Sequence, residues 1–188
     1  LRTKLKNIDK SYHILINNTG GPAGGPITEA NTESFENAFK MHLINNQILA
    51  QSVIPGMIKE GYGRIVNIIS TSVKAPIAGL GVSNTIRAAV ANWAKTLSLE
   101  LGEHGITVNN ILPGFTNTNR LKSIIAKKSE KQGISENEVI KTMMKSIPAN
   151  RFGEAKETAN AVAFLCSPAA SYINGINLPV DGGRTASL

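Results

Sequence analysis

The chain has 188 residues, of which 41% are hydrophobic, and it carries a formal net charge of +7. This length and composition predict a single domain, residues 1–188, with a sizeable core, and no apolar run is long enough to span a bilayer. The basic residues are scattered except at 120–131, which has no aromatic residue to stack on bases and which we interpret as a solvated helix face. We therefore disfavour membrane insertion and nucleic-acid binding. A basic surface suits a phosphorylated cofactor or an acidic partner instead.

The amino-terminal stretch predicts the end of a helix followed by a strand. Residues 1–10 resemble the last turns of an amphipathic helix and lack the apolar core of a signal peptide. Residues 12–16 form a short apolar strand that runs into the turn-rich residues 17–22. The single Cys166 excludes an internal disulfide, favours a reducing, cytoplasmic compartment and is expected to lie in the core.

A long helix and a buried strand come next. Apolar residues at helical spacing predict a helix over 31–59, with Asn31 or Thr32 as its cap and with Pro55 kinking or breaking it near its end. Residues 64–70 are apolar and β-branched, which is typical of a strand that is buried on both faces.

The rest of the chain continues the alternation of helix and strand. The expected elements are a helix over 83–101, a strand over 106–112, helices over 120–131, 136–145 and 153–165, and a strand over 176–180. The charged residues 115–150 predict an excursion that covers a site as a substrate lid. Its apolar side chains either line that site or pack the two short helices onto the body: Ile124, Ile125, Ile140, Met143 and Met144. The whole pattern predicts an α/β fold, a Rossmann-like doubly wound parallel sheet whose ligand crevice lies at the carboxyl ends of the strands.

Four segments in the right order resemble one protein family. Asn17-Asn18-Thr19-Gly20 resembles an NNAG loop, 64–70 a strand that ends in a catalytic serine, 106–118 a VN…PG…T segment beside a nicotinamide, and 180–183 a VDGG motif. Together they resemble the short-chain dehydrogenase/reductase family, and most of all the branch related to 3-oxoacyl-[acyl-carrier-protein] reductases. The resemblance implies an NAD or NADP cofactor and a carbonyl or secondary-alcohol substrate.

The resemblance begins at the helix that precedes the family's fourth strand. We therefore expect the family's first βαβαβ half, with its glycine-rich turn for the pyrophosphate, to be absent from the given chain. Either the sequence comes from a longer chain, or a partner subunit covers the exposed sheet edge. The residue that distinguishes NAD from NADP in this family would belong to that half, so the cofactor preference stays open.

In the family, a serine, a tyrosine and a lysine act together and an asparagine assists them. The resemblance places Ser70 at the serine position, Ser83 at the tyrosine position, Arg87 at the lysine position and His42 at the asparagine position. An aliphatic hydroxyl is a much weaker acid than a phenol, and a guanidinium keeps its proton at any useful pH. The resemblance therefore implies a non-standard site in which Ser70 holds the substrate oxygen and Arg87 holds the ribose.

Two side chains are candidates for the missing proton donor. His42 has an imidazole that titrates near neutrality, and Lys74 follows Ser70 in the same loop. Each has an ordinary alternative, His42 as a helix residue and Lys74 as a surface lysine. Ser70 has one too, since its hydroxyl could simply end the strand with a backbone hydrogen bond.

The resemblance also implies a set of cofactor contacts. The residues expected to bind the dinucleotide are Asn17, Asn18, Thr19, Gly20, Arg87, Pro113, Gly114 and Thr116. The turn residues among them have an alternative role in ending their strands. No metal site is expected.

We expect an atypical short-chain reductase that works as a homodimer or homotetramer through helices 31–59 and 83–101, because the family assembles through these helices. Two rival hypotheses remain: a non-catalytic, reductase-like subunit that binds a nucleotide or acts as a scaffold, and a structural partner in a hetero-oligomer. A fold alone does not decide among them.

Overall fold

The structure is a computed structural model that describes residues 11–187, so the helix end expected over 1–10 lies outside it. Four parallel strands form one sheet in the order β1-β2-β3-β4. The strands are β1 (Ile14–Asn17), β2 (Gly63–Ile68), β3 (Ile106–Pro113) and β4 (Asn177–Val180). All four predicted strands are confirmed, with small shifts at their ends.

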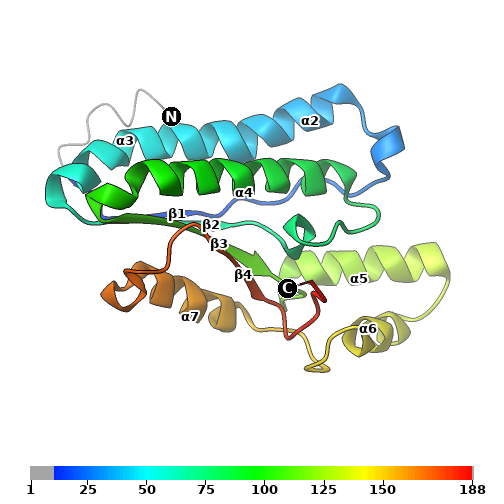
Figure 1. Ribbon diagram of the computed structural model, residues 1–188. Coiled ribbons are helices and arrows are strands. Elements are labelled where there is room, and N and C mark those ends of the chain that lie inside the picture. Colours follow the sequence, from blue (N-terminus) through cyan, green and yellow to red (C-terminus); the bar gives the residue numbers. More distant parts are fainter. Residues whose placement is uncertain (1–10, 188) are drawn as a thin grey trace.

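Helices cover both faces of this sheet, as the doubly wound prediction requires (Figure 1). The helices are α2 (Thr32–Phe39), α3 (Asn45–Glu60), α4 (Gly81–Leu101), α5 (Asn119–Gln132), α6 (Glu136–Lys145) and α7 (Ala155–Cys166). Helices α3 and α4 pack on one face, and α7 packs on the other. None of the helices within residues 11–187 has the length and apolarity that a membrane crossing needs.

The long helix predicted over 31–59 is interrupted. Its cap is Asn31, whose side chain accepts a hydrogen bond from the Ser34 backbone N–H at 2.9 Å. A π-helical turn, Lys40–Ile44, then separates α2 from α3, and such turns are frequent at functional sites. Of the kink or break predicted at Pro55, the break is wrong, because α3 continues through it to Glu60, and the kink stays a prediction. Proline removes the hydrogen bond to the carbonyl of Gln51, four residues earlier, and its ring crowds that carbonyl; Gln51 is exposed here, so the carbonyl can turn outward to water.

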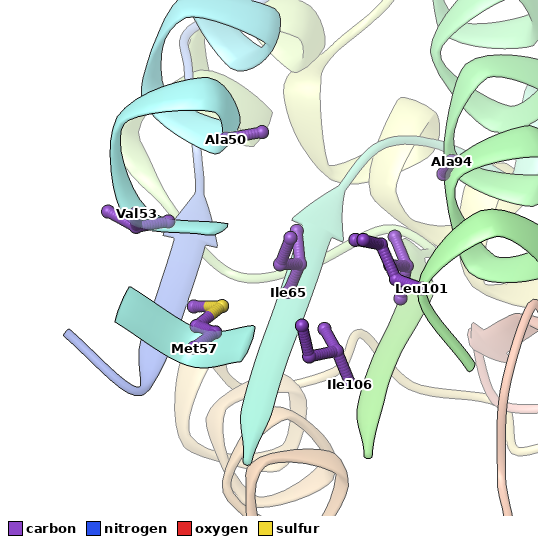
Figure 2. Close-up of a cluster of buried hydrophobic side chains, with 8 residues drawn as sticks. Ala50, Val53, Met57, Ile65, Ala94, Leu101 and Ile106 are labelled. Carbon is purple, nitrogen blue, oxygen red and sulfur yellow. The ribbon is translucent and has the colours of Figure 1, made fainter. Parts of the chain in front are cut away.

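The core on the α3/α4 face forms where both helices meet the sheet (Figure 2). Met57 of α3, Ile65 of β2, Ile106 of β3 and Leu101 of α4 are all buried in one cluster. Gly63 lets α3 approach β2, because a Cβ at this position would lie 2.7 Å from the Met57 sulfur. This packing holds α3 and α4 against the amino-terminal ends of β2 and β3.

On the opposite face, α7 packs against β2 and β3 through a second buried cluster. Cys166 belongs to this cluster and is buried, as predicted, and burial raises the pKa of its thiol.

A ladder of asparagine side chains crosses all four strands. Asn17 of β1 donates to Asn67 of β2 at 2.8 Å, Asn67 donates to Asn110 of β3 at 2.9 Å, and Asn110 donates to Asn177 of β4 at 2.9 Å. The strand register places each pair directly side by side. Asn67 and Asn110 each donate and accept, so the ladder satisfies these buried amides while it aligns the carboxyl ends of the strands; the Oδ1 of Asn17, at the end of the ladder, is buried without a partner among the described residues.

Candidate active site

A cavity of 780 Å³ opens at the carboxyl ends of β1, β2 and β3, where the sequence predicts the crevice. Most of the predicted site residues line it: Asn18, Thr19, Gly20, Ser70, Ser83, Arg87, Pro113, Gly114 and Thr116. Three predicted site residues are not among its lining: Asn17, His42 and Lys74. The structure thus brings segments that are far apart in the sequence to one place.

Two serine hydroxyls line this cavity from different elements. Ser70 follows β2 and caps a short 3-10 turn, where its Oγ accepts a hydrogen bond from the Ser72 backbone N–H at 3.1 Å. Ser70 therefore ends its strand with a backbone hydrogen bond, as the alternative interpretation expected, and it also lines the cavity. Ser83 lies in the first turn of α4 and is half-buried. Both hydroxyls can orient an oxygen of a bound molecule.

Arg87 is the best-anchored charged group of the cavity. Its Nη1 donates to the Ile68 carbonyl at 2.8 Å and its Nη2 donates to the Thr19 carbonyl at 3.2 Å. Its residue surface is only 7% exposed, and burial lowers the pKa of the guanidinium to about 10, so it remains charged at neutral pH. Arg87 therefore ties α4 to the ends of β1 and β2 and places a fixed positive charge there.

His42 lies in the π-helical turn and is 1% exposed. Its Nδ1 shares a hydrogen bond with the Thr19 hydroxyl, and its Nε2 is buried without a partner among the described residues. Burial, and then the charge of Arg87, lowers the pKa of this imidazole to about 4. His42 is thus neutral at pH 7. Its geometry suits positioning of Thr19 better than the proton donation considered from the sequence.

Asn17 and Lys74 also lie outside the cavity lining, and each has another position in the structure. Asn17 is 5% exposed and belongs to the asparagine ladder, so it shapes the loop that follows rather than facing the cavity. Lys74 ends the 3-10 turn after Ser70 and is half-buried.

The strand-ending Pro113 and Gly114 are held by the VDGG segment. A Cβ on Gly114 would lie 2.6 Å from the Cβ of Asp181, so only glycine permits this approach. The Asp181 carboxylate in turn accepts the backbone N–H of Gly183 at 3.0 Å and of Thr185 at 2.8 Å. Two motifs that are distant in the sequence therefore form one rigid corner of the cavity.

Sequence reasoning missed part of the lining. Residues 120–131 were expected to be a solvated helix face, but Arg120 lines the cavity and its Nη2 donates to the Pro22 carbonyl at 3.0 Å. Gly21 was also missed, although it directly follows the NNAG-like loop. The apolar wall comes from β1, β2 and α7 and includes Ile14, Ile16, Ile68, Val162 and Ala163. The available sequence signal for these residues was the spacing of apolar residues along a strand or a helix.

The excursion over 115–150 has a small core of its own. Leu121 and Ile125 of α5 pack against Val139 and Met143 of α6. Of the five apolar residues considered for a lid lining, Ile124 lines the cavity, whereas Ile125, Ile140 and Met143 belong to the small core of α5 and α6.

The charge around the cavity is one-sided. No aspartate or glutamate lines it among the described residues, whereas two arginines do. Within residues 11–187 there is also no group of three or more side chains suited to holding a metal ion.

The family model described as enoyl-(acyl carrier protein) reductase matches residues 2–185. The 3-oxoacyl-[acyl-carrier-protein] reductase FabG of Buchnera aphidicola subsp. Schizaphis graminum is 37% identical over 185 residues, covering 96% of this chain and 70% of that protein. The chain belongs to the short-chain dehydrogenase/reductase family. This confirms the family that the four sequence motifs indicated.

Other members of the short-chain dehydrogenase/reductase family agree in sequence and in fold. The NADPH-dependent reductase BacG of Bacillus subtilis is 33% identical over 175 residues, covering 93% of this chain and 68% of that protein. A crystal structure of L-sorbose reductase from Gluconobacter frateurii, complexed with NADPH and L-sorbose, covers all of this chain at 28% identity and a TM-score of 0.90; the match covers 72% of that chain. Both its sequence and its fold therefore make the chain a short-chain dehydrogenase/reductase, and this family is a family of oxidoreductases.

Proposed function

We propose that this short-chain dehydrogenase/reductase is an NAD(P)-dependent enzyme that interconverts a carbonyl and a secondary alcohol through a non-standard active site, in the manner of 3-oxoacyl reductases. One observation carries the proposal: Ser70, Ser83 and Arg87 meet the NNAG-like loop in one cavity at the carboxyl ends of the strands. The names of BacG and of the L-sorbose reductase complex support NADPH over NADH.

The residues of the cavity suit a dinucleotide. Its 780 Å³ lies in the usual range for ligand sites, and its apolar wall adjoins a polar rim of hydroxyls and glycines. Arg87 has five N–H donors, of which two are hydrogen-bonded to carbonyls, so it can still bind a ribose hydroxyl or a phosphate. Pro113, Gly114 and Thr116 would hold the carboxamide of the nicotinamide.

A nicotinamide held by Pro113, Gly114 and Thr116 would supply or accept the hydride. Ser70 and Ser83 donate hydrogen bonds to the substrate oxygen, and the nearby charge of Arg87 stabilises the negative charge that develops on that oxygen. The charge is effective because it is buried and already fixed by two backbone carbonyls.

The proton on the substrate oxygen comes from solvent in this scheme. Neither candidate donor lines the cavity, and the pKa of His42 at about 4 keeps it from forming the acidic imidazolium at neutral pH. Instead, His42 holds Thr19, whose carbonyl holds Arg87. We propose further that residues 115–150 form the substrate lid, since α5 contributes Leu121, Ile124 and Arg120 to the wall.

The decisive test is NADPH- and NADH-dependent reduction of a panel of 3-oxo esters and cyclic ketones by the full chain. We expect saturable turnover that Ser70→Ala lowers by about 100- to 1,000-fold, because one donor to the developing oxyanion is lost. Ser72→Ala is the matched control: it removes a neighbouring hydroxyl that has no partner among the described residues and does not line the cavity. Equal effects of the two substitutions would contradict the role given to Ser70.

A second pair of variants tests whether the site is non-standard. Ser83→Tyr combined with Arg87→Lys recreates the pair of residues that the family uses, and a positioned general acid contributes about 100- to 10,000-fold to a rate. A gain in turnover in the double variant, with neither single variant giving it, would support the assignment of both positions. A loss of turnover in the double variant would show that Ser83 and Arg87 already perform the role of the family's tyrosine and lysine.

The main rival is a non-catalytic reductase-like subunit that binds a nucleotide or acts as a scaffold. Among the described residues, no strong proton donor lines the cavity, and this favours the rival. Saturable binding of NADPH without reduction of any panel member would establish this rival over the enzyme.

We also propose that the protein assembles as a homodimer or homotetramer through the helices of the α3/α4 face. Large apolar side chains are exposed there, with Leu99 of α4 at 73% and Phe39 of α2 at 41%. Sedimentation of the wild type and of Leu99→Glu tests this, and a smaller species is expected for the variant.

A further inference from the structure

Two arginines converge on one glycine at the rim of the cavity. A Cβ placed on Gly21 would lie 3.9 Å from Nη2 of Arg87 and 3.9 Å from Nη2 of Arg120. Because both nitrogens are 3.9 Å from one point, they are no more than about 7.8 Å apart. Like charges at this separation repel each other, and an anion between them would remove that repulsion.

The backbone holds these guanidinium groups without neutralising them. All of their hydrogen bonds within residues 11–187 go to main-chain carbonyls: Ile68 and Thr19 for Arg87, and Pro22 for Arg120. Neither arginine forms an ion pair in this part of the chain, and no carboxylate lines the cavity. Each guanidinium therefore keeps unused N–H donors and its full charge.

Fixed guanidinium groups with spare donors are the usual receptors for carboxylate and phosphate groups, which they bind through paired hydrogen bonds. The two arginines come from different parts of the site: Arg87 from α4 and Arg120 from the first turn of α5, in the proposed lid. Gly21, without a side chain, leaves the space between them open on the cavity side. An anion bound by both arginines would also bridge the proposed lid to α4.

We propose that Arg120 and Arg87 form an anion subsite, and that the substrate of this enzyme is a carbonyl compound with a carboxylate or a phosphate monoester. This inference rests on the proposed reductase function and adds the substrate class to it. The formal charge of +7 favours the approach of such a substrate. The competing source of the anion is a phosphate of the cofactor, and the experiment separates the two.

The test compares acetoacetate with its neutral ethyl ester as substrates of the full chain, and it measures the binding of acetoacetate and of dihydroxyacetone phosphate by calorimetry. The wild type should prefer acetoacetate in kcat/KM. Arg120→Gln should lower that preference by about 10- to 100-fold, mainly through KM, because a charge-assisted contact made before the chemical step is lost. Arg120→Lys should retain part of it. Lys122→Gln, an equal loss of charge at an exposed residue of the same helix outside the cavity lining, should leave the preference intact.

The outcomes separate this inference from the proposed function. Arg120-dependent binding of either anion without any reduction would support the subsite and remove the enzyme reading. Reduction of the ester with no preference for acetoacetate and no saturable binding of dihydroxyacetone phosphate would overturn the subsite and leave the enzyme. If Arg120→Gln weakens the binding of NADPH and NADH alike, the anion is the cofactor's pyrophosphate. If it weakens the binding of NADPH alone, the anion is the cofactor's extra phosphate. Either result overturns the substrate assignment.

Discussion

The asparagine ladder predicts an asymmetric response to the exchange of an amide for an acid. Asn67 is fully buried, accepts a hydrogen bond from Asn17 at 2.8 Å and donates one to Asn110 at 2.9 Å. Asn67→Asp keeps the size and the accepting oxygen but replaces the donating NH2 with a second oxygen. The Asn110 oxygen then faces a carboxylate instead of a donor.

The magnitude follows from burial. An uncompensated charge left in the core costs about 3–5 kcal/mol, so Asn67→Asp should lower the free energy of unfolding by about that much at pH 7. When protonated, the acid can donate to Asn110 and restore the ladder. Its pKa in the folded variant should therefore lie above the usual 3.9 or so, and the penalty should shrink by about 1.4 kcal/mol per pH unit as the pH falls through the interval between these two values.

Urea unfolding at pH 7.5 and pH 5 measures both effects. Asn177→Asp is the matched control, because Asn177 ends the ladder as an acceptor from Asn110, and an acid accepts equally well. It is also half-buried, so we expect a loss below about 1 kcal/mol. Equal losses for the two variants, or a penalty for Asn67→Asp that does not change with pH, would refute the direction assigned to the ladder.

Two further predictions concern stability. The pKa of His42 is about 4 in the folded chain, below the usual 6.5, so the unfolded chain binds more protons between these two pH values. The free energy of unfolding of the wild type should therefore fall by roughly 3 kcal/mol as the pH falls through this window. His42→Asn should flatten that slope in urea unfolding, with His13→Asn as the control for removing an exposed imidazole, and an unchanged slope would contradict the burial argument. Gly105→Ala should lower the melting temperature far more than Gly133→Ala: both glycines have positive φ, but only at Gly105 would a Cβ collide with the Gly61 carbonyl oxygen. Similar melting temperatures for both variants would show that the turn at Gly105 can shift enough to accommodate a Cβ.

Much of the fold could be predicted because its signals are local. Strand 64–70 is rich in β-branched apolar residues, and the helix over 136–145 has a serine cap with a glutamate three residues later, which forms a capping box with Ser135. The failure at Pro55 is also instructive. Pro55 lies on the exposed face of α3, where water can replace the lost hydrogen-bond donor, so the helix continues past it.

The site was harder to predict, because its geometry depends on pairings across long sequence separations. The asparagines of the ladder each end or interrupt an apolar run, so each one alone resembles an ordinary strand end. Arg120 begins a charged helix, and its contact with Pro22, 98 residues away, cannot be read from spacing. His42 shows the same limit, since a π-helical turn, invisible in the apolar periodicity, places it against Thr19.

The proposed mechanism explains why the residues at positions 83 and 87 would change together. In the family's chemistry, the lysine lowers the pKa of a phenol, and that role has no purpose once the phenol is absent. A guanidinium is then the better cation, because its charge does not depend on pH in the useful range and its planar fork can hold two carbonyls at once. Arg87 does so with Ile68 and Thr19. The pair Ser83 and Arg87 is therefore consistent with a single change, from a site that delivers a proton to a site that stabilises charge.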